Sequence, residues 1–257
     1  MSTDQTRAVI TDFQEANPLL NVRVVDNPNR NIPSGLNRAI ASAQGEWIVR
    51  LDAHSMPRPD YVERSVAALE QGLGENVGGV WEIQPFGNSI QARAIAAVAA
   101  LPLAVGDAHY RFGTRPQITD TVPFGAYARS LVDRIGGYDE SLLTNEDYEF
   151  NTRIRAVGGR VWLDPAIRTV YFARPDLCAL ARQYWRYGYW KARMLRRYPA
   201  SLRWRQAIPP LFVASLVLGA MLAVFWPTMR LLLVGVILLY GLVLFGEGDA
   251  YDAVREW

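Results

Sequence analysis

The sequence predicts an α/β domain with a largely parallel, doubly wound sheet, followed by a basic interfacial helix and a transmembrane helical hairpin. Three observations predict this organisation. Short apolar runs alternate with amphipathic stretches through residues 1–175, as in strand–helix units. Residues 176–206 are basic and rich in Trp and Tyr, and residues 207–246 carry a single charge. The tail, 247–257, is left unassigned.

The composition supports one sizeable folded core. Half of the 257 residues are hydrophobic, and the formal net charge is only +2, so we expect no nucleic-acid partner. The single cysteine, Cys178, excludes an intramolecular disulfide and any site with several cysteine ligands.

The periodicity of the apolar residues assigns each element of the domain. Ser2 or Thr3 is a possible N-terminal cap for the helix expected at 2–16. We expect a turn at Gly136–Glu140 and a polar loop over a site at 106–122. We expect helices at 2–16, 36–43, 59–72, 91–105 and 144–157, and strands at 22–25, 47–51, 77–83, 124–129, 160–163 and 167–172.

The first candidate site lies at the end of the apolar strand 47–51. Asp52 and His54 follow this strand directly. In open α/β sheets, ligands bind outside the carboxyl ends of the strands. A carboxylate and an imidazole at that point can hold a divalent cation that binds a diphosphate. The alternative is an aspartate that caps a turn beside a histidine satisfied by hydrogen bonds.

A second candidate site is the acidic pair Glu146–Asp147 at the start of a predicted helix. A carboxylate there can act as a general base, and the helix N-terminus favours its ionised form. Thr144 and Asp147 also match a capping box, which is a purely structural role.

The chain changes character after residue 176. No acidic residue occurs between Leu177 and Gly246, whereas nine Arg and Lys residues do. A basic helix with many Trp and Tyr side chains suits the headgroup region of an anionic membrane. The aromatic and donor-rich stretch 183–187 also suits sugars and phosphates. The alternative is an ordinary basic helix packed on the domain.

Two uncharged runs follow, Ile208–Trp226 and Leu231–Gly246. The first is long enough for a bilayer core of ~30 Å, and the second is slightly short without its flanks. With only four residues between them, the runs predict a transmembrane hairpin. The preceding basic stretch places the α/β domain in the cytoplasm.

These motifs, in this order, resemble family 2 glycosyltransferases of the GT-A fold, and most closely the membrane-anchored glucosyltransferases of succinoglycan-type exopolysaccharide assembly. The metal motif of that branch is similar to Asp52-Ala53-His54. Its nucleotide segment resembles Gly-Leu-Asn37, and its acidic pair resembles Glu146–Asp147. Residues 183–187 are similar to the Gln-x-x-Arg-Trp motif of processive synthases, but Tyr187 stands where Trp is usual.

The resemblance implies a role for each matching residue. Asp147 is the implied base, and Asp52 with His54 the implied ligands of Mg²⁺ or Mn²⁺. Asp4, Asn37 and Asp52 are implied in nucleotide binding. Glu146, Gln183, Trp185 and Arg186 are expected at the acceptor or diphosphate.

The implied reaction is an inverting transfer of a hexose, glucose by resemblance, from a UDP-sugar to a saccharide on a polyprenyl diphosphate. The expected location is the bacterial inner membrane. The family's first strands have no counterpart before Met1, so we expect a chain that starts inside the nucleotide-binding half and binds UDP-sugar poorly. Two alternatives remain: a non-catalytic protein with a decayed transferase domain, and part of a processive synthase.

Overall fold

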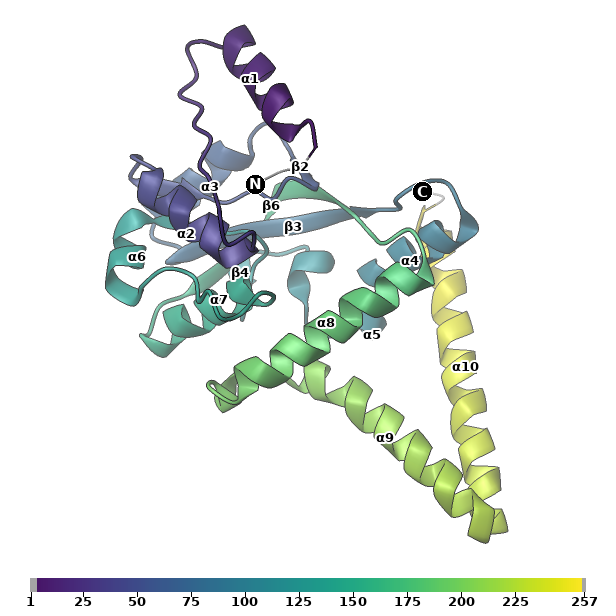
Figure 1. The fold of residues 1–257 in the computed structure, drawn as a ribbon. Coiled ribbons are helices and arrows are strands. Elements are labelled where there is room, and N and C mark those ends of the chain that lie inside the picture. Colours follow the sequence, from purple (N-terminus) through teal and green to yellow (C-terminus); the bar gives the residue numbers. More distant parts are fainter. Residues whose placement is uncertain (1–3, 256–257) are drawn as a thin grey trace. The chain divides into compact units, whose positions relative to one another are not determined.

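The computed structural model describes residues 4–255, with side chains described as far as Leu242. The chain divides into two units. One contains the residues up to 104 together with 108–199, and the other contains 105–107 and the residues from 200 onward. The first unit holds the α/β domain and the basic helix, and the second holds the apolar helices (Figure 1).

A six-stranded mixed sheet forms the centre of the first unit (Figure 1). Among the strands of the described residues, only β3 (Asn76–Gln84) and β6 (Val161–Phe172) pair in parallel, and the other four pairings are antiparallel. The α/β class is as predicted, but the sheet is mixed rather than largely parallel. The strand order is β1 (Trp47–Val49), β5 (Ala126–Ala128), β3 (Asn76–Gln84), β6 (Val161–Phe172) and β2 (Ser55–Pro57), with β4 (Gln117–Ile118) also paired to β6.

The connections explain these strand directions. A parallel pair needs a long crossover, and the chain between β3 and β6 supplies one. β5 follows a loop and enters antiparallel between β1 and β3, which needs no crossover helix. The two strands predicted at 160–163 and 167–172 are one strand, β6, whose register with β3 shifts between Gly78 and Val80.

Eight α-helices of the described chain belong wholly or largely to this unit. They are α1 (Thr6–Ala16), α2 (Ile32–Ser42), α3 (Tyr61–Glu70), α4 (Ile90–Ala100), α5 (Pro102–Val105), α6 (Arg129–Ile135), α7 (Glu146–Ala156) and α8 (Leu177–Leu195), with a short 3-10 turn at His109–Arg111. A second 3-10 turn, Pro199–Ser201, lies largely in the second unit.

Two predictions for the N-terminal part are wrong. The strand expected at 22–25 pairs with no strand in the described chain, and Val24 and Val25 are exposed. α2 begins at Ile32 rather than Leu36, because the Asn31 side chain accepts a hydrogen bond from the Ser34 amide and Pro33 suits the first turn. The caps expected at residues 2 and 3 lie outside the described residues.

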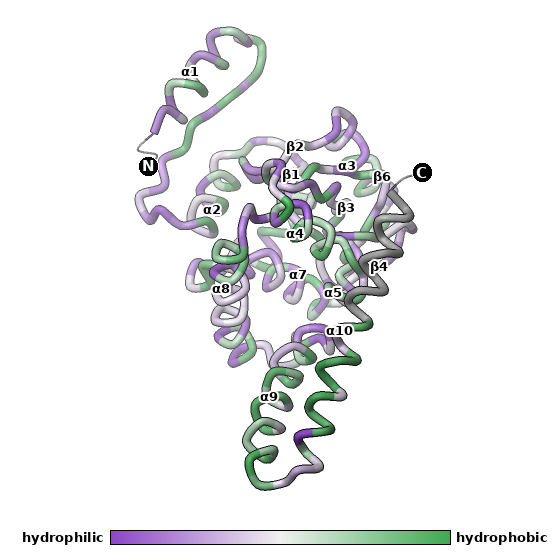
Figure 2. Tube along the Cα trace, turned by 90° about the vertical axis from the view of Figure 1, so that its right-hand side faces the viewer, coloured by the Kyte–Doolittle hydropathy of each residue, from purple (hydrophilic) through white to green (hydrophobic). Residues whose placement is uncertain are grey.

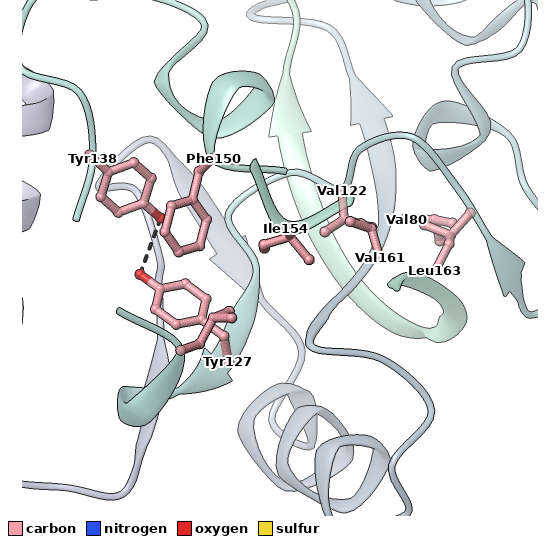
Figure 3. Packing of buried hydrophobic residues seen from close by; sticks show 9 residues of the cluster. Val80, Val122, Tyr127, Tyr138, Phe150, Ile154, Val161 and Leu163 are labelled. Atoms are coloured by element: carbon pink, nitrogen blue, oxygen red, sulfur yellow. Dashed lines mark hydrogen bonds between the residues drawn. The ribbon is translucent and has the colours of Figure 1, made fainter. Parts of the chain in front are cut away.

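The largest buried cluster joins the sheet to α6 and α7, with β3, β5 and β6 contributing from the sheet (Figure 3). Its centre includes Tyr127, Tyr138 and Phe150, whose rings pack at centroid distances of 4.8–5.0 Å. The two tyrosine hydroxyls hydrogen bond at 3.2 Å. This aromatic cluster fixes the turn that carries Tyr138 against the sheet.

The second unit contains α9 (Trp204–Phe225) and α10 (Pro227–Arg255), joined at Trp226 as the predicted hairpin requires. α9 is the one helix of the described residues that is long and apolar enough to cross a membrane, and the apolar part of α10, Pro227–Leu242, is shorter. Figure 2 shows α9 and the Pro227–Leu242 part of α10 as mainly hydrophobic. At the start of α9, Asp107 pairs with Arg203 and Arg205. The crossing of a bilayer stays a prediction.

Candidate active site

The first half of the site is the turn that leaves β1. Trp47, Ile48 and Val49 hold the strand in the sheet, and the Arg50 amide then donates to Gly125 O at 3.0 Å. The chain turns at Asp52, whose carbonyl accepts from both the amide and the hydroxyl of Ser55. Asp52 is therefore held at the carboxyl end of β1 with its side chain partly exposed.

A buried arginine connects this turn to α7. Arg50 Nε and Nη2 donate to the two oxygens of Asp52 at 2.9 and 3.2 Å, and Nη2 also donates to Glu146 Oε1 at 2.9 Å. The Arg50 side chain is only 5% exposed, and its guanidinium carbon lies 5.6 Å from the centroid of the Tyr138 ring. Asp52 and Glu146 thus share one cation, which places the neighbouring Asp147 close to this ion-pair network.

The start of α7 does not form the capping box that the sequence suggested. Asn145 occupies the N-cap position with a left-handed backbone (φ 69°) and makes no side-chain cap bond. The Thr144 hydroxyl instead donates to Leu143 O and accepts from Arg186 Nη2 at 3.2 Å. Asp147 Oδ1 accepts from the neighbouring Tyr148 amide at 2.7 Å. A pure capping role for Asp147 therefore has no support in this geometry.

The two carboxyl groups of the acidic pair are shifted toward their protonated forms. Burial is the main reason that the pKa of Asp147 is raised, although Arg50 opposes the shift. Burial, with the charge of Asp147, likewise raises the pKa of Glu146 to about 7. A general base with a pKa closer to the working pH accepts a proton more effectively. The environment of Asp147 is therefore suited to a proton acceptor.

His54 extends the site toward an aromatic group. Its Nε2 lies 3.7 Å from Asp52 Oδ2, and the side chain is 62% exposed. The His54 ring contacts Tyr171 at a centroid distance of 5.9 Å. Tyr171 in turn stacks on Trp81 at 4.1 Å, with the rings 5° from parallel. The imidazole thus borders a stacked pair of aromatic rings, of which Tyr171 is buried.

Asp52 and His54 fit a divalent cation that arrives with a diphosphate. Arg50 occupies one position on each Asp52 oxygen, which leaves further lone pairs for a cation. Among residues 4–242, no group of three His, Cys, Asp or Glu side chains gathers as a cage. Mg²⁺ is commonly held by one or two carboxylates together with substrate phosphates and water.

Helix α8 brings two of its three predicted residues to the edge of the site. Gln183 Nε2 donates to the Tyr187 and Tyr171 hydroxyls at 2.7 and 3.3 Å, and Arg186 reaches Thr144 in front of α7. Trp185 is 79% exposed. The geometry therefore joins Gln183 and Arg186 to the site, but not Trp185.

Asp4 and Asn37, both predicted to bind nucleotide, have hydrogen-bond partners within the protein. Asp4 accepts from the amide and hydroxyl of Thr6 at the start of α1. The Asn37 amide donates to Tyr138 O and Glu140 Oε1, and its oxygen accepts from Tyr138 N at 2.7 Å. Asn37 thus fixes the turn before α7. Nucleotide binding by either residue stays a prediction.

The sequence reasoning missed Arg50 and Tyr138 as members of the site. A charged residue within an otherwise apolar strand, two positions before Asp52, is a signal that could have identified Arg50, because a buried charge needs a partner. Tyr138 has no comparable signal, since its turn resembles many surface turns until α2 and α7 enclose it.

The sequence of the chain is similar to that of known proteins. The family model described as "Glycosyl transferase family 2" matches residues 1–135. The chain is 33% identical over 229 residues to the succinoglycan biosynthesis protein ExoA of Rhizobium meliloti, covering 87% of the chain and 67% of that protein.

A more distant sequence relative and a solved structure also match the chain. A dolichyl N-acetyl-alpha-D-glucosaminyl phosphate 3-beta-D-2,3-diacetamido-2,3-dideoxy-beta-D-glucuronosyltransferase of Methanococcus voltae is 23% identical over 209 residues, covering 79% of the chain and 64% of that protein. The chain thus spans about two thirds of the length of these curated relatives. The solved mannosyltransferase PcManGT of Pyrobaculum calidifontis has a similar fold, with a TM-score of 0.55 at 22% identity, covering 91% of the chain and 73% of that protein.

Proposed function

This chain belongs to glycosyl transferase family 2, and from that premise we propose that it is an inverting hexosyltransferase. The proposed donor is a UDP-sugar, with glucose as the first candidate. The proposed acceptor is a saccharide on a polyprenyl diphosphate in exopolysaccharide assembly. A sequence identity of 33% to a succinoglycan biosynthesis protein supports this pathway class.

One observation carries the proposal. The Arg50 guanidinium binds Asp52 and Glu146 at once, so the end of β1 and the start of α7 form a single site. A donor diphosphate near Asp52 and an acceptor hydroxyl near Asp147 would then lie beside each other. A single displacement requires this juxtaposition.

Asp147 has the chemical role of base in this proposal. Its carboxylate accepts the proton of the acceptor hydroxyl as that oxygen bonds to the anomeric carbon. The bond between the anomeric carbon and the diphosphate oxygen breaks, and UDP leaves with the electron pair. The Tyr148 amide, which already donates to Asp147 Oδ1, keeps the carboxylate oriented at the start of α7.

Asp52 and His54 are the proposed holders of Mg²⁺ or Mn²⁺. A bound divalent cation supplies charge neutralisation for the departing diphosphate. Asp52 is fixed for this role by Arg50 on one side and by the Ser55 turn on the other. Nucleotide contacts by Asp4 and Asn37 are included in the proposal on the family resemblance alone.

The proposed location is the inner face of a bacterial cell membrane. α8 exposes Trp185 and Tyr189 together with several arginines, and α9 is long and apolar enough to span a bilayer. An acceptor with a polyprenyl chain stays at the membrane surface. Gln183 and Arg186 on α8 are the proposed contacts to this acceptor, and the exposed Trp185 is a proposed contact to lipid.

A transfer assay tests the proposal. Membranes that contain the full-length enzyme are given several radiolabelled nucleotide sugars in turn, and the organic-solvent extract is counted. We expect label from one UDP-hexose in the lipid fraction, added as one sugar per acceptor. Equal counts in membranes with and without the enzyme would contradict the proposed activity.

A further inference from the structure

We propose that Arg50 is a positioning residue. It fixes the donor side of the site, at Asp52, relative to the acceptor side, at Glu146 and Asp147. This inference rests on the proposed function for its catalytic consequence. Arg50 lies two residues before Asp52, yet it also reaches Glu146, which is 96 positions away in the chain. The same Nη2 atom takes part in both contacts.

The energetic cost of this arginine argues against a purely structural role. Its side chain is 5% exposed, and Nη1 has no hydrogen-bond acceptor within the described part of the chain. A buried donor without a partner is destabilising. Apolar residues of similar size often replace a buried ion pair without loss of stability. The guanidinium is better explained by the geometry that it imposes on the two carboxylates.

The surroundings of Arg50 hold the guanidinium in one orientation. Its own amide is bonded to the carbonyl oxygen of Gly125, directly before β5. The Tyr138 ring lies beside the guanidinium, and the Tyr138 hydroxyl is bonded to Tyr127. Asn37 holds the Tyr138 backbone from α2. Because Arg50 is itself fixed to the sheet, its guanidinium holds the carboxylates of Asp52 and Glu146 at fixed positions relative to the sheet.

A lysine cannot reproduce this arrangement. The planar fork of arginine binds both oxygens of one carboxylate and a second carboxylate together, whereas an ammonium group is a compact point charge. Arg50→Lys keeps the charge and removes the fork. We expect Asp52 to lose its fixed orientation, because partners of a metal ligand orient it for the metal.

Direct binding of Mn²⁺ to the detergent-solubilised full-length enzyme, followed by the electron paramagnetic resonance signal of free Mn²⁺, measures this effect without donor or acceptor. Arg50→Lys should weaken Mn²⁺ binding by about 10–100-fold. Its kcat should also fall, with a smaller change in the KM of the donor. The control is Arg58→Lys, because Arg58 makes a similar two-bond contact to Glu82 on the exposed surface.

Glu146→Gln provides a second variant in case Arg50→Lys does not fold. Glutamine keeps an acceptor for Arg50 but removes the charge that holds the guanidinium on the α7 side. Arg50 and Asp52 should then be oriented less firmly, and Mn²⁺ affinity should fall. A folded Arg50→Lys variant with wild-type Mn²⁺ affinity and kcat would overturn the proposal. If that variant is unfolded, unchanged Mn²⁺ affinity in Glu146→Gln overturns it. Persistent transfer by Asp147→Asn would instead contradict the proposed function. The Mn²⁺ binding measurements would still test the role of Arg50, because they need no transfer.

Discussion

Arg50 and Glu146 are joined by a 2.9 Å hydrogen bond between Nη2 and Oε1 in the buried interior of the domain. Because Arg50 also binds Asp52, this contact unites two motifs that are far apart in the sequence. The predictions below follow from treating them as one site.

Asp52→Asn should lose Mn²⁺ affinity while the fold is retained. The asparagine oxygen can still accept a hydrogen bond from Arg50, but it carries no charge for the cation. Isothermal titration with MnCl₂, with UDP present, measures the loss. The control is Asp164→Asn in β6, away from the Arg50 contacts. Equal Mn²⁺ affinity in Asp52→Asn and the wild type would show that Asp52 is not a metal ligand.

The stability of the metal-free domain should fall as the pH rises from about 4.5 toward about 7. In the folded protein, burial raises the pKa of Glu146 to about 7, whereas the unfolded chain releases this proton near the ordinary value of 4.5. The folded state therefore holds more protons in this window, and the rising pH favours unfolding. Thermal unfolding midpoints in EDTA at pH 5, 6, 7 and 8 measure the slope.

Glu146→Gln should flatten this pH dependence, because the glutamine side chain does not titrate. The pKa of Asp147 is also raised by burial, so a shallow slope should remain. If the variant and the wild type lose stability equally between pH 5 and 8, the shifted titration of Glu146 is absent.

Asn37→Ala should destabilise the domain by about 1–3 kcal/mol, because the Tyr138 backbone groups and Glu140 lose their hydrogen-bond partner. Chemical unfolding measures this change, and UDP titration of the same sample separates it from nucleotide binding. Asn21→Ala, on an exposed loop, serves as control. Full stability of Asn37→Ala would contradict the turn-fixing role.

A spin label at position 185 should report contact with lipid. Trp185→Cys in a Cys178→Ser background places one label on the exposed part of α8. In vesicles with anionic lipid, we expect the label to be more accessible to oxygen than to a water-soluble nickel complex. A label at Val62→Cys, exposed on α3, should show the opposite order. The same order at both positions would contradict an interfacial α8.

The elements that the sequence predicts well are those with a strong local signal. α3, α8 and α9 each show a sustained helical pattern or an uncharged run, and each forms close to its expected range. The segment 22–25 shows the limit of such signals. A short apolar run becomes a strand only when a neighbour supplies its hydrogen bonds, and no described strand pairs with this one.

The sequence was enough to predict the carboxylates of the candidate site, but not the side-chain contacts that join them. Asp52 and Glu146–Asp147 could be identified as acidic residues at the ends of elements. The capping box at Thr144 was the wrong expectation, because Arg186 from α8 binds the threonine hydroxyl and Asn145 adopts the left-handed backbone. Both contacts depend on tertiary structure. Arg50 was missed for the same reason, since its partner Glu146 is distant in sequence.

The central claim is that Asp147 is the base of a transfer site that includes Asp52. The most direct measurement is the transfer of radiolabelled glucose from UDP-glucose to the lipid fraction by full-length Asp147→Asn in Mn²⁺. Loss of a general base lowers the rate by about 10²–10⁴-fold, and the thermal midpoint of the variant should stay close to that of the wild type. Asp133→Asn, on the exposed part of α6, should transfer at the wild-type rate. Transfer by a folded Asp147→Asn variant at the wild-type rate would contradict the account.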